Sequence, residues 1–156
     1  MNSINIKIAS LNVRGLISDL KRRKIFLWFE KQDIDLILIQ ETHCSLKNIE
    51  KIRKDWEGLS YWDLTDSHHS RGVGILIKNN LKAEIINTRN RNDGRAILLN
   101  MNINDTIITI VSIYAPNGEN ERCSYFRKLT PWITEHALSM DNTILGGDFN
   151  VCLNWF

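Results

Sequence analysis

Residues 143–150 read TILGGDFN, a short apolar run followed by two glycines, a carboxylate and a carboxamide. In a strand, alternate side chains share a face, so the sequence predicts that Asp148 and Asn150 point the same way. The glycines at 146 and 147 remove side chains where a ligand such as phosphate would need to approach the backbone. We therefore expect Asp148 and Asn150 to lie at the mouth of a catalytic cleft to which other segments contribute.

The bulk properties fit a single globular domain. The chain has 156 residues, of which 43% are hydrophobic and 24% charged, and its formal net charge is +2. Composition therefore indicates neither nucleic-acid nor membrane binding by itself. Basic residues are nevertheless clustered at 21–24 and around Arg89, Arg91 and Arg95. A run of like charges such as 21–24 is typical of a solvated face.

Cysteine usage and the N-terminus indicate the compartment. Cys44, Cys123 and Cys152 are an odd number without a CxxC pair, so neither a disulfide framework nor a zinc site is predicted. The N-terminus alternates polar and apolar residues, which fits neither a signal peptide nor a membrane span. We expect a soluble, intracellular protein that does not contact membranes.

The first third of the chain has a strand–helix–strand pattern. Alternating isoleucines at 4–8 predict a half-buried strand that runs into a polar loop at 11–15. Ser18 is expected to cap a helix, and the nearly apolar residues 34–40 predict a strand covered on both faces. The buried stripe of that helix is expected to consist of Leu20, Ile25, Trp28 and Phe29. A second helix is expected over 46–56. This order is typical of an α/β layer, in which ligands gather at strand ends.

The middle of the chain is rich in β patterns. Strands are predicted at 73–77, 83–86, 96–99 and 106–111, with hairpin-type turns at 79–80, 92–94 and 104–105. A polar loop follows at 112–118. The helical pattern over 121–140 contains Pro131, which predicts a break with a new segment capped by Thr130.

Polar side chains stand at four of the predicted strand ends. They are Asn12, then Gln40 with Glu41, then Tyr114 with Asn117, and finally Asp148 with Asn150. Taken singly, such residues more often make turns than catalyse reactions. Together they supply carboxylate, carboxamide and phenol oxygens, which suit Mg²⁺ or Mn²⁺ and phosphate rather than zinc.

Five segments in order along the chain carry a family resemblance. They read LNVRG at 11–15, LIQETH at 38–43, GVGILI at 72–77, YAPN at 114–117 and GGDFN at 146–150. The set resembles the endonuclease/exonuclease/phosphatase superfamily, and its motif residues are most similar to those of the apurinic-type endonuclease domain of LINE-type non-LTR retrotransposons. The resemblance implies the N-terminal portion of a DNase I-like, two-sheet, four-layer α/β sandwich whose strand ends line a cleft for a phosphodiester.

The resemblance also implies catalytic roles. Glu41 would be the ligand of Mg²⁺ or Mn²⁺, supported by Asn12, and Tyr114 would contact the scissile phosphate or orient the nucleophile. Asp148 would activate water or protonate the leaving oxygen, while Asn150 would hold phosphate and metal. The implied metal set is thus Asn12, Glu41, Asp148 and Asn150, with no small-molecule cofactor, and the physics of metal-assisted phosphoryl chemistry agrees with it.

Three further residues lie close to this set in the sequence. By resemblance Asn117 would be a secondary phosphate contact, and Arg14 is a candidate phosphate contact because its loop carries Asn12. His43 is tempting as a base beside Glu41. It is expected to point away from Glu41 and to have either a role in supporting the site residues or a structural role.

One element of the family is missing from residues 1–156. Its members carry a Ser-Asp-His element late in the domain, and none of His43, His68, His69 and His136 stands in such a context. We therefore expect residues 1–156 to be a domain truncated at its C-terminal end. Nuclease activity should then be impaired, and an uncovered apolar sheet face should promote self-association.

The leading hypothesis is a metal-dependent phosphodiesterase of DNA endonuclease type, either retrotransposon target nicking or apurinic/exonuclease III-like. A phosphatase or lipid phosphodiesterase of the same superfamily is an alternative. A third possibility is a non-catalytic remnant that binds nucleic acid or protein. Salt-dependent DNA binding without hydrolysis would favour the remnant.

Overall fold

Two four-stranded sheets form the centre of the computed structural model, which describes residues 5–66 and 70–151. Cys152, His68 and His69, which entered the sequence predictions, lie outside these ranges. The strands are β1 (Ile8–Asn12), β2 (Leu36–Gln40), β3 (Leu59–Asp63), β4 (Val73–Ile77), β5 (Glu84–Asn90), β6 (Ala96–Ile103), β7 (Thr106–Tyr114) and β8 (Thr143–Asp148). The helices are α1 (Asp19–Lys31), α2 (Ile49–Lys54) and α3 (Glu119–His136).

The strand orders are β1-β2-β4-β3 in the first sheet and β5-β6-β7-β8 in the second. The pairs β1–β2 and β7–β8 are parallel and the remaining pairs are antiparallel. Each sheet therefore contributes one parallel pair whose carboxyl ends lie together. The residues Asn12 and Gln40 are register partners in the first pair, as are Tyr114 and Asp148 in the second.

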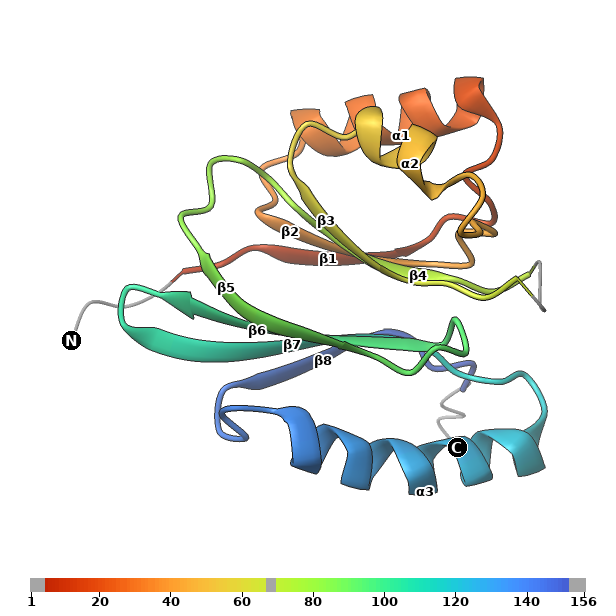
Figure 1. Ribbon diagram of the computed structural model, residues 1–156, viewed down its shortest axis with the longest axis vertical. Coiled ribbons are helices and arrows are strands. Elements are labelled where there is room, and N and C mark those ends of the chain that lie inside the picture. The colour runs from red at the N-terminus through yellow and green to blue at the C-terminus, as the bar shows by residue number, and fades with distance from the viewer. Residues whose placement is uncertain (1–4, 67–69, 152–156) are drawn as a thin grey trace, which may run out of the picture.

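The elements stack as four layers, with α1 and α2 over the first sheet and α3 under the second (Figure 1). Three apolar clusters hold the layers together. One lies between the first two helices and the first sheet, one between the sheets, and one between the second sheet and α3. Strand β2 contributes to two of these clusters because its side chains alternate between its two faces. Leu36 and Leu38 face the other sheet, while Ile37 and Ile39 face the helices. The four-layer α/β sandwich predicted from the sequence is confirmed.

Helix α1 begins as predicted but its buried face differs from the prediction. Ser18 is the N-cap, and its hydroxyl accepts a hydrogen bond from the backbone N–H of Lys21. Leu20 and Trp28, expected to be buried, are 68% and 51% exposed. Phe26 and Arg22 are buried instead. The prediction of a stripe through Leu20 and Trp28 was wrong because the helix turns Arg22 toward the core.

Burial of Arg22 corrects the prediction that residues 21–24 form a solvated face. Its guanidinium pairs with Asp55 and with Asp19, and it donates to the carbonyl oxygen of Leu16 at 2.9 Å. A buried charge is tolerated when it is paired and its donors are satisfied. Arg22 thus ties α1 to the end of α2, while its neighbour Arg23 stays 67% exposed.

The strands of the second sheet were largely predicted, whereas β3 of the first sheet was missed. The turn at Asn104 and Asp105 has φ values of 49° and 62°, the positive pair that a tight hairpin requires. Strand β3 follows α2, which is shorter than expected. Its Trp62 and Asp63 are buried. The sequence predictions placed no strand between the expected helix end at residue 56 and the strand at 73–77, so this element was overlooked.

Helix α3 is continuous, so the break predicted at Pro131 was wrong. The Thr130 hydroxyl donates to the carbonyl oxygen of Phe126, one turn earlier in the same helix, and so does not act as an N-cap. Proline removes one backbone hydrogen bond, and the apolar contacts of Leu129 and Ile133 with the second sheet hold the helix on both sides of it.

The inner faces of the two sheets cover one another, so the uncovered sheet face expected from the sequence is not found in the described ranges. Some exposed apolar side chains lie along the sheet edges, where Leu11 of β1 and Ile144 of β8 are each 40% exposed. No helix within residues 5–66 and 70–151 is long and apolar enough to cross a membrane.

Candidate active site

The carboxyl ends of β1, β2, β7 and β8 meet at one end of the sandwich. Each parallel pair brings two strand ends to the same edge, and the face-to-face packing of the sheets brings the two edges together. The polar residues predicted at strand ends therefore converge from both sheets.

The Asn12 side chain joins the two sheets at this end. Its amide nitrogen Nδ2 donates to Glu41 Oε1 at 2.8 Å and to Asp148 Oδ2 at 3.0 Å. Its Oδ1 accepts the backbone N–H of Arg14 at 3.1 Å. Two carboxylates would repel each other in a partly buried site, and the shared amide donor offsets that repulsion. Asn12 thereby fixes how Glu41 and Asp148 face each other.

Asp148 is held on both of its carboxylate oxygens. While Oδ2 accepts from Asn12, Oδ1 accepts the backbone N–H of Asn150 at 3.0 Å. Asn150 has φ 50°, and its Nδ2 donates to the carbonyl oxygen of Ala115 at 2.7 Å. The strand ends at Asp148, so the prediction that the two side chains share a strand face was wrong. A left-handed turn brings them together instead.

Tyr114 closes the end of β7 and is only 7% exposed. Burial, reinforced by a hydrogen bond with the Glu41 carboxylate and by its negative charge, raises the pKa of Tyr114 to about 12. A tyrosine phenol is already neutral at physiological pH and can act as a hydrogen-bond donor, and the raised pKa extends this to higher pH. The guanidinium of Arg95 lies over its ring, with Cζ at 5.3 Å from the ring centroid.

Glu41 and His43 both lie in a strained loop after β2. Their φ values are 50° and 56°, and the loop is pinned by the Gly15 N–H, which donates to the Glu41 carbonyl oxygen at 2.7 Å. The prediction that His43 points away from Glu41 was wrong, because His43 Nε2 lies 3.8 Å from Glu41 Oε2. Residues two apart share a face of a strand, so strand alternation does not support that prediction, and the strand itself stops at Gln40.

A cavity of about 620 Å³ opens beside Asp148. Its walls include Asn12, Gln40, Asp148 and Asn150. Gln40 is buried, its Oε1 accepts from the Ser10 hydroxyl at 3.3 Å, and its Nε2 has no partner in the described ranges. Sequence reasoning noted Gln40 at a strand end without giving it a role. Its position on the inter-sheet face, in phase with Leu36 and Leu38, was the signal that could have done so.

Two residues predicted to contact phosphate, Arg14 and Asn117, lie outside this set. Arg14 is exposed, and only its backbone takes part, through the N–H that Asn12 accepts. Asn117 is also exposed, and its carbonyl oxygen accepts from Arg122 at 2.8 Å. The structure thus gathers Asn12, Glu41, Tyr114, Asp148 and Asn150, with Arg14 and Asn117 at the periphery.

The two glycines before Asp148 serve packing rather than ligand approach. A Cβ on Gly146 would lie 2.6 Å from Leu38 Cδ1 of the other sheet. A Cβ on Gly147, whose φ is 143°, would overlap the backbone carbonyl oxygen of Ile113. These glycines are therefore explained by the close contact between β8 and its neighbours, and not by the approach of a phosphate that the sequence led us to expect.

The donor set fits a divalent ion with oxygen ligands in part. Glu41 and Asp148 supply two carboxylates, and Asn150 Oδ1 accepts no hydrogen bond from the described residues. Asn12 fits less well, because its oxygen is engaged by Arg14 and its nitrogen faces the carboxylates. In the described part of the chain, no three His, Cys, Asp or Glu side chains are grouped to hold a metal ion.

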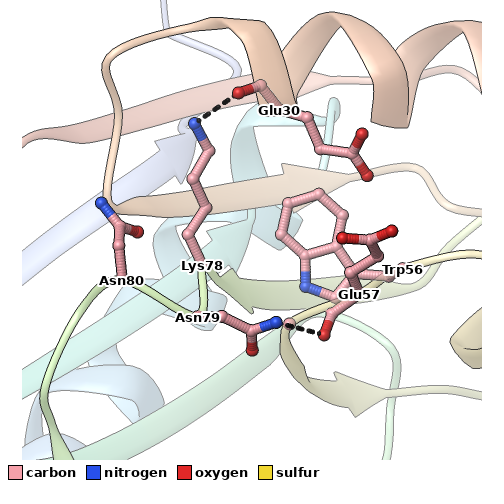
Figure 2. Close-up of a pocket in the computed structure, with 7 residues that line it drawn as sticks. Glu30, Trp56, Glu57, Lys78, Asn79 and Asn80 are labelled. Atoms are coloured by element: carbon pink, nitrogen blue, oxygen red, sulfur yellow. Dashed lines mark hydrogen bonds between the residues drawn. The ribbon is translucent and has the colours of Figure 1, made fainter.

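A second cavity lies between the end of α1 and the segments before β3 and after β4 (Figure 2). Lys78 donates to the carbonyl oxygen of Glu30 at 3.2 Å, and Asn79 donates to that of Glu57 at 2.8 Å. Trp56 forms one wall, and its indole N–H donates to the Leu59 carbonyl oxygen. These bonds join α1 and the segments flanking β3 and β4, which gives the cavity a structural explanation.

Known proteins resemble this chain in sequence and fold. The model of the Endonuclease/Exonuclease/phosphatase family matches residues 9–155. An exodeoxyribonuclease from Bacillus subtilis (strain 168) is 23% identical over 154 residues, which cover 94% of this chain and 59% of that protein. The chain thus spans about three-fifths of the length of this curated relative.

Two solved structures share the fold. The endonuclease domain of TRAS1, a telomere-specific non-LTR retrotransposon, matches with a TM-score of 0.62 and 14% identity, covering 97% of this chain and 62% of that one. D. rerio TDP2 complexed with a single-strand DNA product matches with a TM-score of 0.67 and 14% identity, covering 94% and 61%. The family resemblance predicted from five short segments is confirmed, including its likeness to a non-LTR retrotransposon endonuclease domain.

Proposed function

The chain belongs to the endonuclease/exonuclease/phosphatase family, and we propose that it contributes the catalytic end of a divalent-metal-dependent phosphodiesterase acting on DNA. Members of this family generally depend on a divalent metal ion. The observation that carries the proposal is the pair of hydrogen bonds from Asn12 to Glu41 and Asp148. They set two carboxylates from different sheets around one point at the strand ends.

Each residue of the site has a task that its contacts support. Glu41, with Asp148 and Asn150, would hold Mg²⁺ or Mn²⁺, which when bound neutralises charge on the phosphoryl oxygens. Tyr114, whose phenol is protonated at physiological pH and buried at the end of β7, would donate a hydrogen bond to a phosphate oxygen. Asp148, oriented by two donors, accepts or returns the proton of the reacting oxygen. Asn12 acts through these carboxylates and positions them.

Two observations support DNA as the substrate. The curated relative is an exodeoxyribonuclease, and the structure of TDP2 carries a single-strand DNA product. Arg14 and Asn117 flank the strand ends and are exposed, so they are free to contact phosphates on either side of the site. Retrotransposon-type nicking and apurinic/exonuclease III-like cleavage are both forms of the reaction that this proposal includes, since the likeness to TRAS1 concerns the fold.

Hydrolysis by residues 1–156 alone is expected to be weak. In this family Asp148 would act with a histidine, and no histidine of the described ranges is in hydrogen-bonding or ionic contact with Asp148. His43 lies beside Glu41 instead. Rapid Mg²⁺-dependent nicking of supercoiled plasmid that Glu41→Ala abolishes would contradict this weakness while supporting the enzyme class.

The proposed function is tested by DNA binding with and without metal. The wild type should bind a labelled oligonucleotide more tightly in Ca²⁺ or Mg²⁺ than in EDTA, because the ion links the carboxylates to a phosphate. Glu41→Gln should lose that increment, and Glu57→Gln, a glutamate outside the site, should keep it. Salt-dependent binding that is indifferent to metal and to Glu41 would favour a non-catalytic remnant instead.

Self-association is proposed to use the edges of the sandwich. Ile144 and Leu145 of β8 are 40% and 39% exposed, and an unpaired edge strand can pair with another chain. Ile144→Lys should shift a concentration-dependent sedimentation profile toward the monomer, and an unchanged profile would exclude this edge.

A further inference from the structure

Two arginines of the basic cluster around residues 89–95 lie against aromatic rings, and one of them, Arg95, contacts Tyr114. Arg95 Nη1 donates to the Tyr114 carbonyl oxygen at 3.1 Å, and its guanidinium covers the Tyr114 ring. Arg91 lies over the rings of Tyr125 and Trp132, with Cζ at 5.4 and 5.9 Å from their centroids. Aromatic contacts of this kind hold a guanidinium in place without using its N–H donors.

These two arginines line a cavity of about 450 Å³ between the β5–β6 turn and the first turns of α3. We name it the arginine cavity; its walls include Arg91, Asp93, Arg95, Glu121 and Lys128. The three cations exceed the two carboxylates. Lys128 is exposed and makes no ion pair within the described ranges, so its ammonium is available to a ligand.

Asp93 contacts both arginines, and each of its carboxylate oxygens already has a partner. Its Oδ1 accepts the backbone N–H of Arg95 at 3.0 Å, and its Oδ2 pairs with Arg91 Nε at 3.4 Å. A guanidinium has five N–H donors. Within the described residues, Arg91 uses only its Nε–H and Arg95 only one N–H of Nη1. The remaining donors have a planar fork geometry that matches two oxygens of one phosphate.

Tyr114 connects the candidate active site to Arg95, a wall residue of the arginine cavity. Its ring and carbonyl oxygen contact Arg95, while its hydroxyl interacts with Glu41. Pro116, two residues further along, also lines the cavity. A strand with one phosphate at the Asn12–Glu41–Asp148 cluster would therefore pass directly from Tyr114 to the arginine cavity.

We propose that the arginine cavity binds a second phosphodiester of the DNA strand whose scissile phosphate lies at Asn12, Glu41 and Asp148. The proposal rests on the proposed function and adds a subsite to it. Arg91 and Arg95 supply the donor forks, and Lys128 supplies a point charge at the rim. Binding there orients the strand and requires more than one phosphodiester in the substrate.

The chain offers a matched control for this subsite. Arg89 lies two residues before Arg91 in the same cluster, but it is exposed on β5 and donates to its neighbour's carbonyl oxygen at Thr88. It does not line the cavity. Arg89→Gln therefore removes the same charge as Arg91→Gln from nearly the same place in the sequence.

The test compares two DNA probes by fluorescence anisotropy in Mg²⁺ with the full chain. One probe is a dinucleotide with a single phosphodiester, and the other is a single strand of about ten nucleotides, within the range that one binding groove covers. Arg91→Gln and Lys128→Gln should each weaken the longer strand about three- to tenfold and lower the salt slope by roughly one phosphate contact. Dinucleotide binding should not change, and Arg89→Gln should change neither.

The outcomes separate the subsite from the function on which it rests. If both subsite variants bind the longer strand like Arg89→Gln, the subsite is overturned and the function stands. A second outcome is that the subsite variants bind the longer strand more weakly, while metal and Glu41→Gln change the affinity for neither probe. The arginine cavity is then a DNA contact, and the proposed phosphodiesterase function is overturned. A wild type that binds neither probe overturns both. Lys128 is exposed, so its variant remains informative even if Arg91→Gln unfolds.

Discussion

Asn12 Nδ2 and Asp148 Oδ2 are 3.0 Å apart although 136 residues separate them in the sequence. The bond crosses from the first sheet to the second, and the same nitrogen also holds Glu41. The candidate site therefore exists only when both sheets are packed together, and its geometry depends on the fold of the whole described region.

Asn12→Asp should make the site dependent on metal for its stability. A third carboxylate would replace the donor that now lies between two others, and the loss of stability in EDTA is expected to be on the order of 1–3 kcal/mol. Mg²⁺ should raise the melting temperature of this variant more than that of the wild type. Asn117→Asp adds the same charge at an exposed position and should show neither effect.

If Asn12→Asp melts like Asn117→Asp in EDTA, the two carboxylates do not depend on the Asn12 amide. Thermal unfolding followed by circular dichroism with and without Mg²⁺ gives both quantities from the same samples.

Gly147→Ala should destabilise the chain strongly. Its φ of 143° is rarely adopted by other residues, and the new methyl group would overlap the Ile113 carbonyl oxygen of β7. The expected cost is roughly 3 kcal/mol or more, because neither strand can move without breaking the β7–β8 ladder. Gly118→Ala is the control, since its Cβ would meet only Glu121 at 3.9 Å. Equal urea midpoints for the two variants would contradict this view of β8.

Arg22→Leu should cost about 3–5 kcal/mol, the range for breaking a buried ion pair. The substitution leaves Asp55 without its main partner and the Leu16 carbonyl oxygen without its donor. Arg23→Leu, one residue along the same helix, changes an arginine that is 67% exposed and should stay within about 0.5 kcal/mol of the wild type. Chemical denaturation of both variants measures the contrast, and a small effect at Arg22 would show that α1 and α2 do not depend on it.

Asp63 should make stability fall with rising pH in the mildly acidic range. Burial, with a smaller effect from the charge of Asp93, raises the pKa of Asp63 from 3.8 to about 6, although three backbone N–H groups donate to it. The folded chain holds its proton where the unfolded chain has lost it. The stabilisation is therefore complete below pH 4 and is lost as pH rises to about 6, by on the order of 2–3 kcal/mol.

The Asp63 carboxyl carbon, followed by NMR, should titrate with a midpoint near 6. In urea denaturation across the same range, Asp63→Asn should lack this component of the pH dependence. A midpoint near the ordinary aspartate value would show that the three N–H donors outweigh burial.

The convergence of the candidate-site side chains, which the structure shows, could be expected from local rules. Periodicity placed β2 and β7, and polar residues at the ends of buried strands identified Asn12, Glu41, Tyr114 and Asp148. Because parallel strands end at a common edge, no detailed geometry was needed to expect these side chains together.

The errors arose where tertiary contacts override local preference. An arginine is rarely buried in a core, but the N–H donors of Arg22 are satisfied here. They pair with Asp55 at the end of α2 and donate to two backbone carbonyl oxygens before α1. Pro131 is a helix breaker by itself, but packing on the second sheet holds the helix through it. The φ of Asn150 and the packing roles of Gly146 and Gly147 depend on neighbours in other strands, which a single sequence does not show.

The central claim is that Glu41, oriented by Asn12 beside Asp148, holds a divalent ion. Titration of the chain with Mn²⁺, followed by the electron paramagnetic resonance signal of the free ion, tests it most directly. The wild type should bind one ion with an affinity that Glu41→Gln lowers at least about tenfold, since even the loss of a residue that only supports a metal ligand costs about that much. Glu57→Gln should bind like the wild type. Equal Mn²⁺ affinity in the wild type and Glu41→Gln would contradict the claim.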